Sequence, residues 1–207
     1  MNLNELFKLQ AELDKRIVEK HNLQGQDLLP KKILALQVEL GELANEWRGF
    51  KFWSSDQEPR TDAVCEQCEG YGTEYQDFEV RGPYGIEHHS IGFSCRKCKG
   101  AGYVNVNPLL EEYVDCLHFI LSIGNDLGIK VTTVEEVQRT DITFVFNELF
   151  DIVSRLRNIH ILRGYEYIWL LKEFINLSKM LGFTWEQVEQ TYLEKNKINH
   201  ERQANGY

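Results

Sequence analysis

Two copies of one cysteine motif constrain this chain most strongly. CEQCEGYG at 65–72 and CRKCKGAG at 95–102 both follow the pattern CxxCxGxG. Two CxxC pairs supply four thiolates at tetrahedral reach, and the glycines allow tight turns that aim backbone N–H groups at the sulfurs. Four thiolates leave no open coordination position, so the pattern predicts a structural Zn²⁺ rather than four free thiols in a loop. The predicted zinc ligands are Cys65, Cys68, Cys95 and Cys98.

The segment around these motifs differs in composition and periodicity from the rest of the chain. From Ser54 to Asn107 it holds seven of the 15 glycines, two of the 4 prolines and four of the 5 cysteines, without helical periodicity. It therefore reads as a turn-rich insert. Residues 1–53 and 108–207 repeat apolar positions at helical spacing. The sequence predicts an all-α class: a multi-helix bundle of 1–53 and 108–207 with a small zinc module at 54–107.

The expected helices have recognisable starts. Pro30 and Pro108 each precede a helical apolar pattern, as prolines in a first turn do. Thr184 and Gln187 form the pattern of a capping box before the last helix. Further apolar stripes run over 3–20, 142–161 and 165–181. We therefore expect helices over these stripes and after each of these starts.

The charge balance restricts the partners. A net charge of −9 argues against binding a nucleic-acid polymer, because phosphate neutralisation needs clustered Lys and Arg. A single nucleotide can still bind if divalent cations lie between the two negative partners. The sequence shows neither a signal-peptide pattern nor an apolar run of membrane-spanning length, so we expect a cytoplasmic protein without a membrane partner. Reduced thiols in that compartment favour metal binding over disulfides.

Two pairs of carboxylates recur at helical spacing. Glu39 and Glu42 are three residues apart, and so are Glu112 and Asp115. Asp115 lies deep in an apolar run, where an unpaired carboxylate is costly to bury. Two such pairs on two helices favour a shared Mg²⁺, since hard oxygen ligands suit this cation. The alternative is that these carboxylates pair with Lys or Arg from another helix. His118 extends the face of Asp115.

The last helix carries a stripe of phosphate-binding chemistry. Lys195, Asn199 and Arg202 fall at i, i+4 and i+7 and share one face. Two cations flanking an amide donor can clamp phosphate oxygens. The alternative is a basic face in water.

These motifs carry a family resemblance. ExxE on one helix and ExxD on the next resemble the all-α nucleoside triphosphate pyrophosphatases, which include dimeric dUTPases, MazG-like enzymes and dCTPases. The C-terminal string YLEKNKINHERQANGY at 192–207 resembles the dimeric dUTPase motif KNxxNxxRQxxGY. LQAELD at 9–14 and FKFW at 50–53 resemble that family's uracil-side segments, although Asp14 stands where family members often carry Asn. The cysteine motifs resemble the zinc-binding repeats of DnaJ-type chaperones.

The dUTPase resemblance implies a homodimeric enzyme that hydrolyses dUTP to dUMP and pyrophosphate with Mg²⁺. It implies that Glu39 orients and deprotonates the attacking water. The implied catalytic and Mg²⁺-binding residues are Glu39, Glu42, Glu112 and Asp115. The implied substrate-binding residues are Gln10, Lys51, Trp53, His118, Lys195, Asn199, Arg202 and Tyr207. Two alternatives stay open: a dCTPase or broad house-cleaning pyrophosphatase, and a zinc-bearing binding protein without catalysis.

Overall fold

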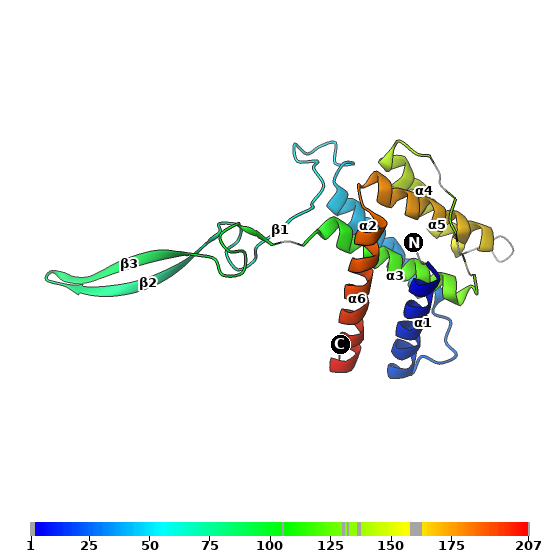
Figure 1. The fold of residues 1–207 in the computed structure, drawn as a ribbon, viewed down its shortest axis with the longest axis horizontal. Helices are drawn as coiled ribbons and strands as arrows, with labels where there is room; N and C mark the ends of the chain where they lie inside the picture. The colour runs from blue at the N-terminus through cyan, green and yellow to red at the C-terminus, as the bar shows by residue number, and fades with distance from the viewer. Residues whose placement is uncertain are drawn as a thin grey trace. The chain divides into compact units, whose positions relative to one another are not determined.

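Apolar residues at helical spacing form six α-helices in the described part of the chain (Figure 1). The computed structural model describes residues 3–104, 106–129, 131, 133–135, 138–157 and 163–206. The helices are α1 (Leu3–Lys20), α2 (Leu29–Trp47), α3 (Pro108–Asp126), α4 (Ile142–Leu156), α5 (Arg163–Met180) and α6 (Trp185–Asn205). The predicted mostly helical class is confirmed. No helix in these ranges combines the length and apolarity needed to cross a membrane.

The helix ends follow from local sequence. Pro30 lies in the first turn of α2, where its missing N–H costs nothing. The capping box of α6 is present: the Gln187 N–H donates to Thr184 Oγ1 at 3.3 Å, and the Thr184 N–H donates to Gln187 Oε1 at 2.9 Å. Gly206 ends α6 with φ 86°, in the left-handed region that glycine adopts without strain. The expected stripe 142–161 ends as a helix at Leu156, and 158–162 lie outside the described residues.

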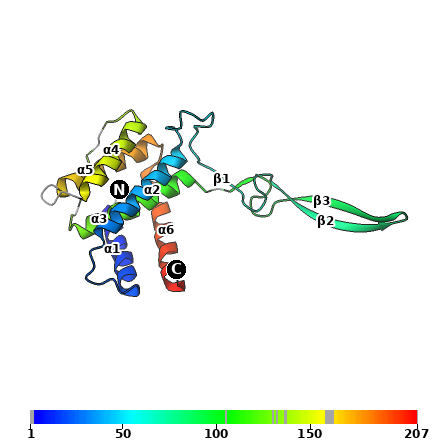
Figure 2. The ribbon, with the colours of Figure 1, turned by 180° about the vertical axis from the view of Figure 1, so that it is seen from behind.

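Chain folding divides the molecule into two compact units, Met1–Pro59 with Leu109–Tyr207 and Arg60–Pro108. In the first unit, α2 packs against α4, α4 against α5, and α1 against α6 (Figure 2). The helix α3 has twelve buried residues, more than any other helix described, and nine of them belong to the hydrophobic core. Its Tyr113 stacks on Phe174 with ring centroids 4.3 Å apart and donates a hydrogen bond to the Phe174 carbonyl.

The second unit consists of two antiparallel strand pairs. Strand β1 (Ala63–Val64) pairs with β4 (Tyr103–Val104), and β2 (Thr73–Gly82) pairs with β3 (Gly85–Ser94). The four cysteines lie between the two pairs. Both long strands are exposed along nearly their whole length. The core of this unit is therefore the cysteine cluster itself, with Val104 packed against it.

One glycine shows how closely α3 is packed. A Cβ at Gly124 would collide with the Tyr167 hydroxyl and lie 2.8 Å from Phe7 Cε1. Gly41 in α2 has open space at the same position, since nothing lies within 4 Å of its Cβ site. We expect Gly124→Ala to destabilise the protein by about 1–3 kcal/mol through overpacking. Gly41→Ala should stabilise it by about 0.5–1 kcal/mol, because alanine favours a helix interior.

Chemical denaturation of the wild type and both variants would show whether the free energy of unfolding falls in Gly124→Ala and rises in Gly41→Ala. Equal effects of the two substitutions would contradict the close approach of Tyr167 to α3.

Candidate active site and zinc centre

Three of the four predicted carboxylates come together. Oxygens of Glu39 on α2 and of Glu112 and Asp115 on α3 all lie within 4.8 Å of one another. Glu42 is exposed and lies outside this trio, although its charge acts on both Glu39 and Glu112. The i, i+3 spacing places each pair on one helix face, and packing of α2 and α3 in the common core brings the two faces together. We call Glu39, Glu112 and Asp115 the carboxylate trio.

The carboxylate trio carries more negative charge than nearby positive groups neutralise. Partial burial, together with the negative charges of Asp115 and Glu42, raises the pKa of Glu39 to about 7. The pKa of Glu112 rises to about 7 for the same reasons. Glu112 Oε2 is buried and has no hydrogen-bond partner among the described residues. Three carboxylates and an orphaned oxygen fit a hard divalent cation such as Mg²⁺.

A lysine from another helix provides part of the missing charge. Lys195 Nζ on α6 donates to Asp115 Oδ2 at 2.6 Å. The alternative reading of Asp115, a carboxylate paired with a lysine, is thus realised at this position. The Lys195–Asp115 ion pair does not neutralise Glu39 and Glu112, whose carboxylates still lie within 4.8 Å of each other.

A cavity of about 520 Å³ opens beside the trio. Its volume is typical of small-molecule sites, which span about 300–1,000 Å³. Seven of the predicted site residues line it: Gln10, Glu39, Asp115, His118, Lys195, Asn199 and Arg202. Phe119, Ser122 and several aliphatic side chains of α1 and α2 also line it, so one wall can accept an apolar ring.

Other predicted residues lie elsewhere. Trp53 is 66% exposed and does not line the cavity. Lys51 is half-buried, with its Nζ 5.6 Å from the centroid of the Phe50 ring. Tyr207 lies outside the described residues.

Sequence reasoning did not assign Lys31 and Lys32, which line the cavity from the first turn of α2. Lys32 Nζ lies 2.7 Å from Asp126 Oδ2 and 3.5 Å from Asp14 Oδ2. A signal was available, because two lysines at a helix N-terminus oppose the helix dipole and require acidic partners nearby.

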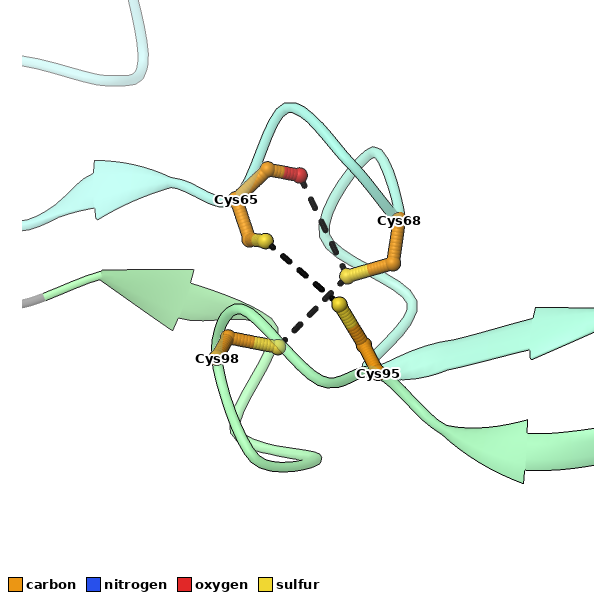
Figure 3. Close-up of side chains that lie close together, drawn as sticks. All are labelled: Cys65, Cys68, Cys95 and Cys98. Carbon is orange, nitrogen blue, oxygen red and sulfur yellow. Dashed lines mark hydrogen bonds between the residues drawn. The ribbon is translucent and has the colours of Figure 1, made fainter.

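The four cysteines form a second centre in the Arg60–Pro108 unit. Their Sγ atoms lie within 4.8 Å of one another, and all four side chains are buried (Figure 3). The Gly72 and Gly102 N–H groups donate to Cys68 Sγ and Cys98 Sγ, each at 3.2 Å. Cβ atoms at these glycines would collide with backbone oxygens of the opposite knuckle. Four converging thiols with N–H support therefore fit a closed tetrathiolate zinc site.

Removing a thiol should remove the metal. We expect Cys65→Ser to lose bound zinc and to open 60–108 to proteolysis, because this unit has almost no other buried core. Zinc analysis and limited proteolysis measure both effects. Cys116→Ala is the matched control, since Cys116 is buried in α3, belongs to the other unit and is not one of the four clustered cysteines, so the zinc content should be unchanged.

The carboxylate trio predicts an unusual pH dependence without metal. A folded-state pKa raised to about 7 stabilises the fold when the group is protonated. The contribution is full below the ordinary glutamate pKa of 4.5 and is lost as pH rises through about 7. Glu112→Gln should therefore raise the melting temperature of metal-free protein near pH 8 and weaken its pH dependence. Saturating Mg²⁺ should stabilise the wild type but not this variant.

Glu111→Gln is the matched control for that experiment. Glu111 lies in the first turn of α3 outside the trio, where its charge favours the helix dipole. Its loss should slightly lower the melting temperature and leave the Mg²⁺ effect intact. Equal responses of the two variants would show that the trio is not strained by repulsion.

Comparison with known proteins agrees with this geometry. A family model described as dUTPase matches residues 2–69 and 99–207. The matched ranges include the whole carboxylate trio and the Lys195, Asn199 and Arg202 stripe, and they omit the β2–β3 hairpin. A comparison with curated proteins gives no match. The chain belongs to the dUTPase family and is an enzyme that hydrolyses dUTP or a related nucleotide.

Proposed function

We propose that this enzyme hydrolyses dUTP to dUMP and pyrophosphate in a Mg²⁺-dependent reaction at the cavity beside the carboxylate trio. The observation that carries the proposal is the meeting of two helices' carboxylates with the α6 stripe around one nucleotide-sized cavity. An acidic trio alone would repel a triphosphate, and a basic stripe alone would hold it without activating water. Both are within reach of one ligand here.

The trio and Glu42 would hold the metal. When bound, Mg²⁺ would offset phosphate charge and lower the pKa of a coordinated water. Glu39 and Asp115 both line the cavity, but Asp115 already accepts a hydrogen bond from Lys195. Glu39 is therefore the carboxylate best placed to orient the attacking water and take its proton.

Lys195, Asn199 and Arg202 would bind the phosphate oxygens. They line the cavity at one-turn intervals on α6, so one helix can follow an extended triphosphate. Arg202 Nη1 lies 3.4 Å from Asn199 Oδ1, which keeps the two polar ends together. Their positive charge and N–H donors would stabilise the negative charge that develops during phosphoryl transfer. Lys51 is a further candidate from the segment that follows α2.

The sugar and base would lie along α3. His118 and Phe119 follow Asp115 by about one turn, and Ser122 lies another turn beyond, so the wall runs about 10 Å from Asp115 to Ser122. A nucleotide with its phosphates at Asp115 would place deoxyribose against His118 and Phe119. Trp53 is exposed, although its ring edge-packs with Phe50 and Phe52, and it would cover the base. Tyr207 remains a candidate from the motif.

We also propose that the enzyme is a cytoplasmic homodimer. Leu34 and Val38 lie one turn apart on α2 and are 62% and 51% exposed. Exposed aliphatic residues on one helix face favour burial against another chain. Light scattering during gel filtration would show a mass near twice 24.3 kDa, and a monomeric mass would contradict the dimer.

A nucleotide panel tests the activity. With Mg²⁺ we expect pyrophosphate release from dUTP well above that from dCTP or dTTP, and no release when the metal is chelated. Comparable rates with dCTP would support the broad pyrophosphatase instead. No Mg²⁺-dependent hydrolysis at all would support a binding protein.

Glu39→Gln tests the assigned base. The loss of general-base chemistry should lower kcat about 10²–10⁴-fold. Glu111→Gln should retain the wild-type kcat, because Glu111 is outside the trio. A Glu39→Gln variant with near wild-type kcat would overturn the role of Glu39.

A further inference from the structure

The two cysteine knuckles are joined by a matching pair of backbone hydrogen bonds. The first knuckle runs from Cys65 to Gly72, and the second runs from Cys95 to Gly102. The Cys65 N–H donates to the Gly102 carbonyl, and the Cys95 N–H donates to the Gly72 carbonyl, each at 2.8 Å. Each knuckle therefore begins with a bond to the last glycine of the other knuckle.

One side chain joins the two knuckles as well. Glu74 lies on β2, two residues after Gly72, and is half-buried. Its Oε1 accepts from Gln67 Nε2 of the first knuckle at 2.7 Å and from the Arg96 N–H of the second at 2.8 Å. Gln67 lies between two cysteines and Arg96 directly follows Cys95, so one carboxylate oxygen bridges both CxxC pairs.

The two halves of the cysteine cluster differ at this position. Because the knuckles share the pattern CxxCxGxG, Val104 stands after the second knuckle where Glu74 stands after the first. Val104 is apolar and packs against the cysteine cluster. A side chain without an acceptor cannot form the bridge that Glu74 forms. The bridge is therefore a feature of Glu74 and does not follow from the repeated motif.

Charge alone disfavours a carboxylate at this position. The Cys95 thiol hydrogen-bonds to the Glu74 carboxylate, and a thiol must lose its proton to bind zinc. The carboxylate would then face a thiolate, and like charges at hydrogen-bond distance repel each other. The hydrogen bonds from Gln67 and Arg96 oppose this repulsion, and they are stronger than neutral ones because the acceptor is ionised.

We propose that Glu74 is a positioning residue of the zinc centre, which bridges Gln67 and Arg96 and so holds the two CxxC pairs at the separation that zinc requires. Groups that orient metal ligands without touching the metal commonly contribute about 10–100-fold to metal affinity. The nucleotide site takes no part in this role, so the inference goes beyond the proposed function. It makes the first residues of β2 part of the zinc centre.

Zinc competition with a chromophoric chelator tests the bridge in the full-length protein. Glu74→Ala removes both hydrogen bonds and should weaken zinc binding about 10–100-fold. Glu74→Gln keeps an oxygen that can accept both bonds, so it should retain most of the affinity. Asp77→Ala is the matched control, because it removes an exposed carboxylate from the same strand and should not weaken zinc binding.

Two further measurements distinguish loss of the bridge from general unfolding. Co²⁺ bound to Glu74→Ala should keep the absorption spectrum of a tetrahedral tetrathiolate, since all four thiols remain. In zinc-loaded protein, hydrogen exchange at the Arg96 amide should be faster in Glu74→Ala than in the wild type, because that N–H loses its acceptor. Asp77→Ala should leave the exchange rate unchanged.

Several outcomes would overturn the proposal. Unchanged or tighter zinc binding in Glu74→Ala would show that charge repulsion outweighs the bridge. Equal losses in Glu74→Ala and Asp77→Ala, a Glu74→Gln variant as weak as Glu74→Ala, or loss of the tetrahedral Co²⁺ spectrum would also contradict it. A wild type that binds no zinc would overturn it together with the zinc centre. The nucleotide panel would still decide the proposed function independently.

Discussion

Repulsion among the carboxylates of Glu39, Glu112 and Asp115 is the constraint on which the site depends. Water would keep such groups apart, but here they lie on helices whose opposite faces are buried in one core. The free energy of burying Leu36, Leu40 and the apolar residues of α3 holds the carboxylates together. The fold therefore contains a local excess of negative charge that a bound divalent cation would relieve.

The helix α3 connects that charge to the rest of the cavity. Its buried side packs on α5 so closely that Gly124 has no room for a side chain. Its other side presents Asp115, His118 and Ser122 in sequence along the cavity. A rigid helix with this spacing can arrange phosphate, sugar and base chemistry in one line, because each turn advances about 5.4 Å.

The Arg60–Pro108 unit is stabilised in a different way from the helical unit. A two-stranded hairpin is marginally stable alone, and β2 and β3 bury almost nothing. Order in this unit rests on four thiols and on the glycines that let two knuckles approach each other. Metal coordination by these thiols would take the place that apolar burial has in the helical unit. We therefore expect the two units to respond to different perturbations, the helical unit to changes in core packing and the Arg60–Pro108 unit to loss of its thiols.

Much of this arrangement is local and could be predicted from the sequence. Apolar periodicity, first-turn prolines and the Thr184 capping box determine the helices, and fixed spacing places Lys195, Asn199 and Arg202 on one face. The spacing within the paired cysteine motifs likewise predicts four converging thiols. Spacing within single helices could not show that Asp115 meets Lys195, or that Glu42 lies outside the trio that Glu39 joins. Those pairings join residues far apart in the chain, and only the packing of α2, α3 and α6 decides them.

The role of Gln10 shows the same division most clearly. The family resemblance implied only that it is a substrate-binding residue in a segment on the uracil side. Its partners Asp14, His118 and Tyr192 come from three helices, and their hydrogen-bonding capacities jointly determine how its amide is oriented. The sequence by itself determined which helices form and which chemistry each helix face carries. Tertiary structure alone decided which groups meet, because a buried polar side chain takes its orientation from partners that only folding brings within reach.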